Sequence, residues 1–290
     1  MNNTFKAHLL MLFTTLVAAF NYSISKEVMP EYMSPYGLIV IRSICAASVF
    51  YITDALFIKE KIQKEDYVAI FLCALTGAAI NQLFFYRGLS LTSPINATLM
   101  MTSIPILVFI ISSIIIKEKI TFIKILGITL GATGAVLLLL NSDITSSNSS
   151  FIGDLFMLLN GVSYAVFLVI IKPLVLKYNA ITLMKWIFGL GLIMIMPFGV
   201  PDLYDVQWNS IPSIIWIAII FIIIFPTILN YYFNAAVLKY INPSIVGIYI
   251  YLQPPLTAII AISWGKDNLT LEKVGYSFLI LVGVFLVSKK

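Results

Sequence analysis

The chain has 290 residues, of which 60% are hydrophobic and 11% charged, and its formal net charge is +5. A soluble domain carries about 25% charged residues, so the composition excludes a soluble globular protein and predicts an integral membrane protein. The positive charges are scattered singly along the chain, which argues against a nucleic-acid partner.

The first apolar run could be mistaken for a signal peptide, but it continues to Val28 and further spans follow, which favours an uncleaved first helix. A helix needs about 20 mostly apolar residues to cross the hydrocarbon core. Ten such spans are predicted near residues 7–28, 35–56, 67–89, 95–116, 122–140, 153–174, 180–200, 211–236, 244–264 and 271–288. The polar stretch NSDITSSNSS at 141–150 predicts a flexible link between two halves.

The lysines predict the orientation of these spans, because cytoplasmic loops carry an excess of positive residues. With the N-terminus inside, thirteen lysines lie at the inner ends and loops, namely Lys6, Lys59, Lys61, Lys64, Lys117, Lys119, Lys124, Lys172, Lys177, Lys185, Lys239, Lys289 and Lys290. Three lysines, Lys26, Lys266 and Lys273, then lie outside. Both termini are therefore predicted to be cytoplasmic.

The two halves of the chain match each other at an offset of 149 residues. The matching pairs include Asn81 with Asn230, Phe84 with Phe233, Pro94 with Pro243, Pro105 with Pro254, Lys117 with Lys266, Thr121 with Thr270 and Gly134 with Gly283. This predicts a first repeat at 1–141, a linker at 142–152 and a second repeat at 153–290. Each repeat has five spans, an odd number, so the fold class is all-α with ten transmembrane helices in two inverted five-helix repeats.

Pro105 and Pro254 occupy equivalent places near the middle of the fourth and ninth spans. Proline removes a backbone donor and breaks or kinks a helix. Inverted repeats are typical of secondary transporters, whose broken helices meet at the substrate site. We therefore expect these helix breaks to line a central cavity, although a simple packing kink at each proline is the alternative.

Four stretches of the chain resemble the EamA family of the drug/metabolite transporter superfamily. They are SPYGLIVIRSI (34–44), LSLTSPINATLMMTSIPILVFIISSIIIKEKIT (89–121), GDLFMLLNGVSYAVFLVIIKP (153–173) and NYYFNAAVLKYINPSIVGIYIYLQPPLTAII (230–260). The resemblance implies ten helices, cytoplasmic termini, and export of amino acids or similar metabolites across a bacterial inner membrane.

Arg42 lies seven residues past Pro35, inside the second predicted span, and ionisable residues inside a membrane are functional candidates. It could bind a substrate carboxylate, or it could tether freed carbonyls as a structural residue, and the resemblance favours the tether. Lys26 and Lys172 lie near span ends, where snorkelling to the interface is sufficient. No Asp or Glu lies at mid-depth, so the sequence predicts no proton-coupling carboxylate.

The remaining polar residues of the spans are mostly neutral and amphipathic, and as a set they suit a cavity for a small zwitterionic or amphipathic solute. With Arg42, the predicted substrate-binding residues are Asn21, Tyr22, Asn81, Tyr86, Met101, Asn160, Tyr164, Trp186, Asn230, Asn234, Tyr249 and Gln253. Polar side chains also hold membrane helices together, and this role stays open for each amide. The repeat further predicts that Asn81 and Asn230 face the cavity from opposite leaflets.

These patterns predict a secondary transporter of small metabolites such as amino acids that works by alternating access, and the resemblance to the EamA family implies that it acts as an exporter. A passive channel or a membrane scaffold is the alternative. No P-loop, H-E-x-x-H motif or nucleophile elbow occurs, so neither an enzyme nor a cofactor is expected. Cys45 and Cys73 lack metal spacing, so no metal site is expected either. The expected partners are the solute and the lipid bilayer, and a homodimer is left open.

Overall fold

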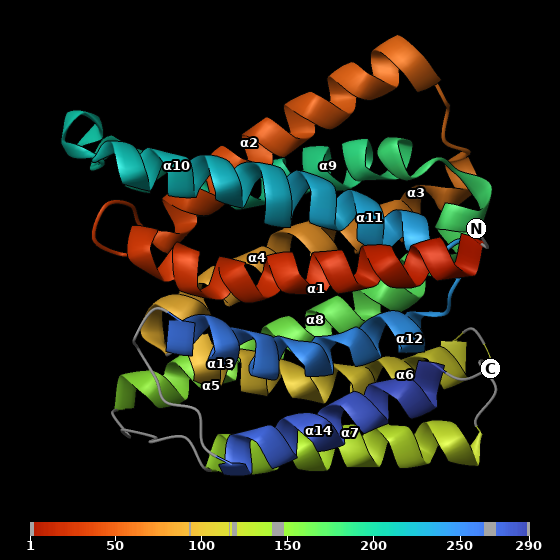
Figure 1. Ribbon diagram of the computed structural model, residues 1–290. Helices are drawn as coiled ribbons and strands as arrows, with labels where there is room; N and C mark the ends of the chain where they lie inside the picture. Colours follow the sequence, from red (N-terminus) through yellow and green to blue (C-terminus); the bar gives the residue numbers. More distant parts are fainter. Residues whose placement is uncertain are drawn as a thin grey trace.

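The structure, a computed structural model, describes residues 3–92, 94–115, 117, 121–140, 148–263 and 271–288. Regular structure in these residues is helical, and the helices lie side by side in one bundle (Figure 1). The α-helices are α1 (Asn3–Val28), α2 (Pro35–Thr53), α3 (Tyr67–Cys73), α4 (Ile80–Leu91), α5 (Pro94–Met100), α6 (Ile104–Ile115), α7 (Phe122–Leu140), α8 (Asn148–Lys177), α9 (Ala180–Tyr204), α10 (Ser213–Ile222), α11 (Asn230–Val237), α12 (Pro243–Ile248), α13 (Gln253–Ser263) and α14 (Leu271–Ser288). Short π-helical and 3-10 turns lie between some of them.

Seven segments of the described chain are long and apolar enough to cross a membrane. They are Thr4–Val28, Pro35–Ile58, Lys64–Leu91, Phe151–Lys177, Ala180–Tyr204, Ser213–Val237 and Pro243–Ile260. Shorter apolar helices cover Ile104–Ile115, Phe122–Gly134 and Val274–Gly283. Large apolar side chains such as Ile114, Ile193 and Phe278 are exposed on the outside of the bundle. Helices satisfy their backbone hydrogen bonds internally, as a lipid environment requires. The chain is therefore a multi-pass membrane protein.

Four spans of the bundle, two from each half, change their winding at equivalent places. The π-helical turn Ala74–Ala79 (η3) precedes α4, and the π-helical turn Ile223–Leu229 (η6) precedes α11, with starting residues 149 apart. The 3-10 turn Met101–Ser103 (η4) precedes Pro105, and the 3-10 turn Tyr249–Leu252 (η7) precedes Pro254. Each proline is thus the second residue of a new helix, where its missing N–H costs no helical hydrogen bond.

The linker predicted at 142–152 is shorter than expected on its C-terminal side. Helix α8 begins at Asn148, so residues 148–152 are helical, while residues 142–147 lie outside the described part of the chain. Helix α1 begins and α14 ends at the same end of the bundle (Figure 1).

Helices α2 and α9 pack along their length and are joined at both ends by reciprocal contacts. At one end Ser34, the N-cap of α2, donates to Asp202 at 2.6 Å. At the other end Thr182 donates to Asp54 at 2.7 Å. Ser34 and Thr182 are 148 residues apart, as are Asp54 and Asp202, so the two contacts exchange roles between the helices. Lys185 adds an ion pair of 2.6 Å at the Asp54 end.

Lys26 and Lys172 do more than snorkel toward the interface. Lys26 Nζ donates to the carbonyl of Ser90 at 3.0 Å, near the end of α4. Lys172 Nζ donates to the carbonyls of Leu238 and Ile241, the latter at 3.0 Å, just after α11. A cation at a helix C-terminus pairs with carbonyls that lack a helical partner. Both lysines therefore hold helix ends in place.

Helices α7 and α14 approach each other through glycine. A methyl group on Gly283 would lie 2.6 Å from the carbonyl oxygen of Gly127 and 2.7 Å from the backbone nitrogen of Gly131. Small residues allow membrane helices to bring their backbones this close. Gly275 also lies on α14, but a methyl group there would meet nothing within 4 Å.

We expect Gly283→Ala to lower the free energy of unfolding by about 1–3 kcal/mol, because α7 and α14 must separate to admit the methyl group. Gly275→Ala is the matched control on the same helix, and it should leave stability unchanged or slightly raised because alanine favours helix. The measurement is the melting temperature of both variants in detergent. Equal melting temperatures for the two variants would contradict the close approach at Gly283.

Candidate functional site

A cavity of about 120 Å³ lies inside the bundle, between helices that come from both halves of the chain. One water needs roughly 10–15 Å³ on this scale, so the cavity has room for a small solute in place of several waters. Its lining consists of Met11, Thr14, Thr15, Ala18, Asn21, Tyr22, Arg42, Asn81, Gln82, Phe85, Met101, Ile104, Asn160, Tyr164, Phe167, Pro226, Asn230, Tyr231, Asn234, Val246, Tyr249, Ile250 and Gln253.

Helix α1 gives one face to this cavity. Its lining residues occur at positions 11, 14, 15, 18, 21 and 22, a spacing of three or four residues that keeps them on one side of a helix. The hydroxyls of Thr14 and Thr15 both donate to the carbonyl of Met11, at 3.0 and 2.7 Å. Met11, Thr14 and Thr15 were not predicted as site residues, although the two threonines, as polar residues in an apolar span, were a signal for this face.

Most of the predicted site residues come together here. Asn21, Tyr22, Arg42, Asn81, Met101, Asn160, Tyr164, Asn230, Asn234, Tyr249 and Gln253 all line the cavity. Tyr86 and Trp186 are not in the lining. Tyr86 is fully buried beneath the guanidinium of Arg42, and the ring of Trp186 lies 5.4 Å from Lys185 Nζ.

The two predicted helix breaks flank the cavity without lining it. Pro105 and Pro254 are absent from the lining, but their neighbours Ile104 and Gln253 belong to it. A third proline, Pro226 in the π-helical turn η6, does line the cavity and was not predicted. The changes in winding therefore bring neighbouring side chains to the cavity wall, while Pro105 and Pro254 themselves do not line it.

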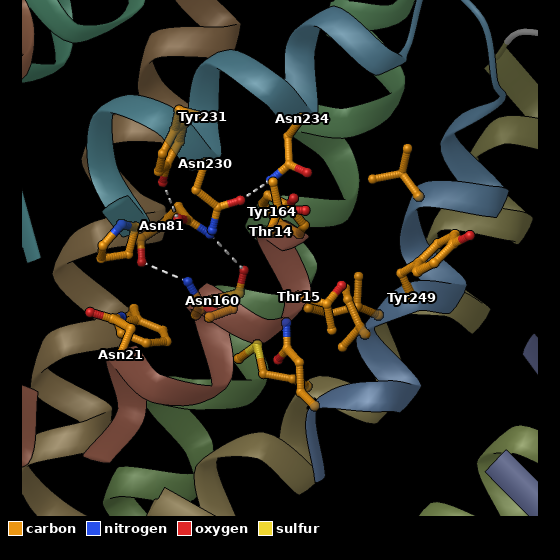
Figure 2. A pocket seen from close by; sticks show the side chains of 18 of the residues that line it. Thr14, Thr15, Asn21, Asn81, Asn160, Tyr164, Asn230, Tyr231, Asn234 and Tyr249 are labelled. Carbon is orange, nitrogen blue, oxygen red and sulfur yellow. Dashed lines mark hydrogen bonds between the residues drawn. The ribbon is translucent and has the colours of Figure 1, made fainter. Parts of the chain in front are cut away.

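Amide side chains form one wall of the cavity, with Tyr249 on the opposite side (Figure 2). Asn160 Nδ2 donates to the carbonyl of Asn81 at 2.7 Å, and Asn81 Nδ2 lies 3.4 Å from the carbonyl of Asn160. This reciprocal pair ties α4 to α8. Asn81 Oδ1 also accepts from Gln82 at 2.7 Å and lies 3.1 Å from the hydroxyl of Tyr231.

The π-helical turn η3 provides backbone acceptors for this network. The hydroxyl of Tyr231 lies 3.0 Å from the carbonyl oxygen of Gly77, and Ser163 donates to the carbonyl of Thr76 at 2.6 Å. A π-helical turn disturbs the regular hydrogen-bond ladder of a helix and occurs often at functional sites. The widened turn thus helps to hold Tyr231, a residue of the second half, against α4 of the first half.

Arg42 is 3% exposed and is held by neutral partners. Its Nε donates to Thr227 Oγ1 at 2.7 Å and its Nη1 donates to Gln82 Oε1 at 2.6 Å. Its guanidinium carbon lies 4.6 Å from the centre of the Tyr86 ring. Arg42 therefore joins α2 to α4 and to η6, and it also reaches the cavity.

Helix α1 meets the broken span of the second half at two points. His8 Nδ1 lies 2.7 Å from the hydroxyl of Tyr249, and the hydroxyl of Tyr22 donates to Gln253 Oε1 at 3.1 Å. Thr14, Thr15 and the other lining residues of α1 lie between these contacts along the chain. The cavity is therefore bordered on both sides by side-chain contacts between the two halves.

The cavity offers polarity with little charge. Arg42 is the one charged residue in the lining among the described residues, and the rest are amides, hydroxyls and apolar groups. No cluster of three or more His, Cys, Asp or Glu occurs in the described part of the chain, so the arrangement shows no metal site there. Such a site can bind a small polar or amphipathic solute by hydrogen bonds and apolar contact.

Comparisons with known proteins agree on one family. The model of the EamA-like transporter family matches residues 5–140 and again residues 151–289. The chain is 27% identical over 266 residues to an uncharacterized transporter of Bacillus subtilis, YyaM, covering 89% of this chain and 85% of the relative. It is 24% identical over 293 residues to an uncharacterized transporter of Archaeoglobus fulgidus, covering 98% of each.

More distant similarity extends to plants and to a solved structure. A WAT1-related protein of Arabidopsis thaliana, At2g37460, is 23% identical over 299 residues, covering 91% of this chain and 77% of the relative. A solved crystal structure aligns with a TM-score of 0.72 and 18% identity, covering 98% of this chain and 94% of the other. At that identity the structural match supports a shared fold alone.

Proposed function

Because the chain belongs to the EamA-like transporter family, we propose that it is a secondary transporter that exports small amphipathic metabolites, such as amino acids, across a bacterial inner membrane. The observation that carries this proposal is the cavity itself. It lies where the two halves meet, and its lining combines neutral amides and hydroxyls with aromatic and aliphatic groups. Transporters of this architecture bind their substrates near such a repeat interface.

The transporter has ten membrane-spanning helices in two inverted repeats, at 1–141 and 153–290. The packing of the described helices supports this proposal. Helix α1 packs against α11 and α13, while α8 packs in the corresponding way against α4 and α6. The pairs α2–α9 and α7–α14 each join equivalent helices of the two repeats. This pattern is expected of two repeats related by a two-fold axis, and rocking of one repeat against the other would give alternating access.

Counterflow distinguishes this function from a passive channel or a scaffold. Purified protein is reconstituted into liposomes that are loaded with an unlabelled mixture of amino acids, and a trace of labelled amino acid is added outside. A carrier produces transient accumulation of label, because each inward step is exchanged for an outward one. Label that only equilibrates would indicate a channel, and absence of any flux would indicate a scaffold.

The lysine distribution supports the proposal that both termini lie in the cytoplasm, and single cysteines test this orientation. In a background with Cys45→Ala and Cys73→Ala, we expect a cysteine at the exposed position Asn209 to react with impermeant thiol reagent added to intact cells. A cysteine at Gln63, which is also exposed, should react only after the membrane is permeabilised. Mass spectrometry of the labelled protein makes the measurement. Labelling at position 63 but not at position 209 in intact cells would contradict the proposed orientation.

A further inference from the structure

The guanidinium of Arg42 is a buried charge whose hydrogen-bonding and ring partners among the described residues are all neutral. Salt bridges in the described residues join Lys177 to Asp66 and Lys185 to Asp54, and neither involves Arg42. The side chains that hold Arg42 are an amide, a hydroxyl and an aromatic ring. A charge buried away from water is costly unless it is paired. The described protein therefore provides hydrogen bonds to Arg42 without providing a counter-charge.

The unused donors of Arg42 show where a counter-charge would bind. A guanidinium has five N–H donors, and protein acceptors take the one on Nε and one on Nη1. The second donor on Nη1 and both donors on Nη2 have no acceptor among the described residues. Because Arg42 belongs to the cavity lining, a solute in the cavity can reach this side of the guanidinium. Two parallel N–H donors match the two oxygens of a carboxylate.

The cavity lining also holds an acceptor without a partner. Asn234 lines the cavity, and its Nδ2 donates to Asn230 at 2.8 Å, but its Oδ1 is buried without a hydrogen-bond partner. In Figure 2 the oxygen of Asn234 points away from Asn230. A buried acceptor that makes no hydrogen bond costs free energy, so this site favours a ligand that brings a donor. The cavity is thus lined by unused donors of Arg42, and the unpaired acceptor Asn234 Oδ1 lies buried at its edge.

We propose that Arg42 is the anion subsite of the transporter and binds the carboxylate of the substrate, which supplies the missing counter-charge. This inference rests on the proposed transport function and narrows its substrate class to carboxylates, chiefly those with a hydrogen-bond donor such as amino acids. Amphipathic amines and other solutes without an acidic group are rejected. Arg42 remains a tether of α2 through Thr227 and Gln82, and its remaining donors select the substrate.

A labelling experiment on the native residue tests the subsite without a transport assay. The chain has two arginines, Arg42 and Arg87, so in an Arg87→Lys variant Arg42 is the single target for phenylglyoxal. The probes are L-leucine, its carboxamide and isopentylamine. All three have the same alkyl chain, but only L-leucine has a carboxylate. We expect L-leucine to slow modification of Arg42, measured by mass spectrometry, and the amide and the amine to have little effect. Isocaproate, which lacks the donor for Asn234, should protect less than L-leucine.

Transport provides the second arm, with a matched control. Arg42→Gln should weaken competition by L-leucine about 10- to 150-fold, the loss expected when a hydrogen bond to a charged group is removed. Arg87→Gln, a change outside the cavity lining, should leave competition unchanged. Arg42→Lys keeps the charge but loses the paired donors, so it should be intermediate.

Three outcomes would overturn the subsite, and they differ from failure of the transport function. In the first, phenylglyoxal does not modify Arg42. In the second, Arg42 is modified at the same rate in the presence of L-leucine and of its carboxamide. In the third, the unmutated protein exchanges carboxylic acids and their amides equally well. In the last case the transport function would stand. If L-leucine protects Arg42 from phenylglyoxal but the protein exchanges no solute, the carboxylate subsite would be supported and the transport function would be contradicted.

Discussion

Replacing Asp54 with asparagine is expected to lower the free energy of unfolding by about 3–5 kcal/mol, the loss typical of a buried ion pair deprived of one partner. The side chains of Lys185 and Asp54 are 13% and 5% exposed, and their charged atoms are 2.6 Å apart. Asp54 also accepts from Thr182 at 2.7 Å. Asparagine would leave the ammonium of Lys185 in a poorly hydrated place without its counter-charge. The measurement is the melting temperature of the purified variant in detergent.

Two controls separate charge loss from a general weakening of the α2–α9 contact. Adding Lys185→Met to Asp54→Asn removes the stranded charge, so the double variant should recover much of the lost stability. Asp202→Asn changes the equivalent aspartate at the other end, where Ser34 donates at 2.6 Å and the described residues provide no ion pair. We expect this change to cost only about 1 kcal/mol. Similar losses at Asp54 and Asp202 would show that the ion pair contributes little.

Asn81→Ala and Asn230→Ala are expected to give opposite results, although the two residues are equivalent in the sequence repeat. Asn81 is buried and bonded to Asn160, Gln82 and Tyr231, which lie on helices of both halves. Its removal should lower the free energy of unfolding by about 1–3 kcal/mol, because its partners lose buried hydrogen bonds. Among the described residues Asn230 bonds only to Asn234 on its own helix.

Asn230→Ala should therefore change binding more than folding. If its amide contacts the solute, affinity should fall about 5- to 150-fold for a loss of about 1–3 kcal/mol, with the melting temperature nearly unchanged. Substrate affinity and melting temperature are measured side by side for both variants. Asn230→Ala with lower stability but intact affinity would remove Asn230 from the binding site and make it a helix contact.

The family and the membrane-spanning helical character could be predicted from the sequence. An apolar run long enough to span the membrane must form a helix, because a helix satisfies its own backbone hydrogen bonds in lipid. The composition and the lengths of the apolar runs therefore predict a helical membrane protein. The conspicuous polar residues of the spans were also good guides. Asn160, Tyr164 and Gln253 all line the cavity, because a polar side chain in an apolar helix is placed away from lipid.

Which side of each helix faces the cavity was decided by the tertiary structure. In a membrane, apolar side chains suit both the lipid surface and the bundle interior, so hydrophobic periodicity does not separate the two. Tyr86 and Trp186 were therefore indistinguishable from lining residues in the sequence, yet they are absent from the cavity lining, while the apolar Met11 belongs to it.

The partners of the charged residues were also decided by tertiary structure. Lys26 meets the carbonyl of Ser90, Lys185 meets Asp54, and Arg42 meets Gln82, contacts that span from 40 to 131 residues of chain. A sequence shows that a charge in a span needs a partner, because the cost of leaving it bare is large. It does not show which distant segment provides that partner, since this depends on how the helices pack. The sequence by itself determined that this is a helical membrane protein of one family, and helix packing decided which of its polar groups face the cavity.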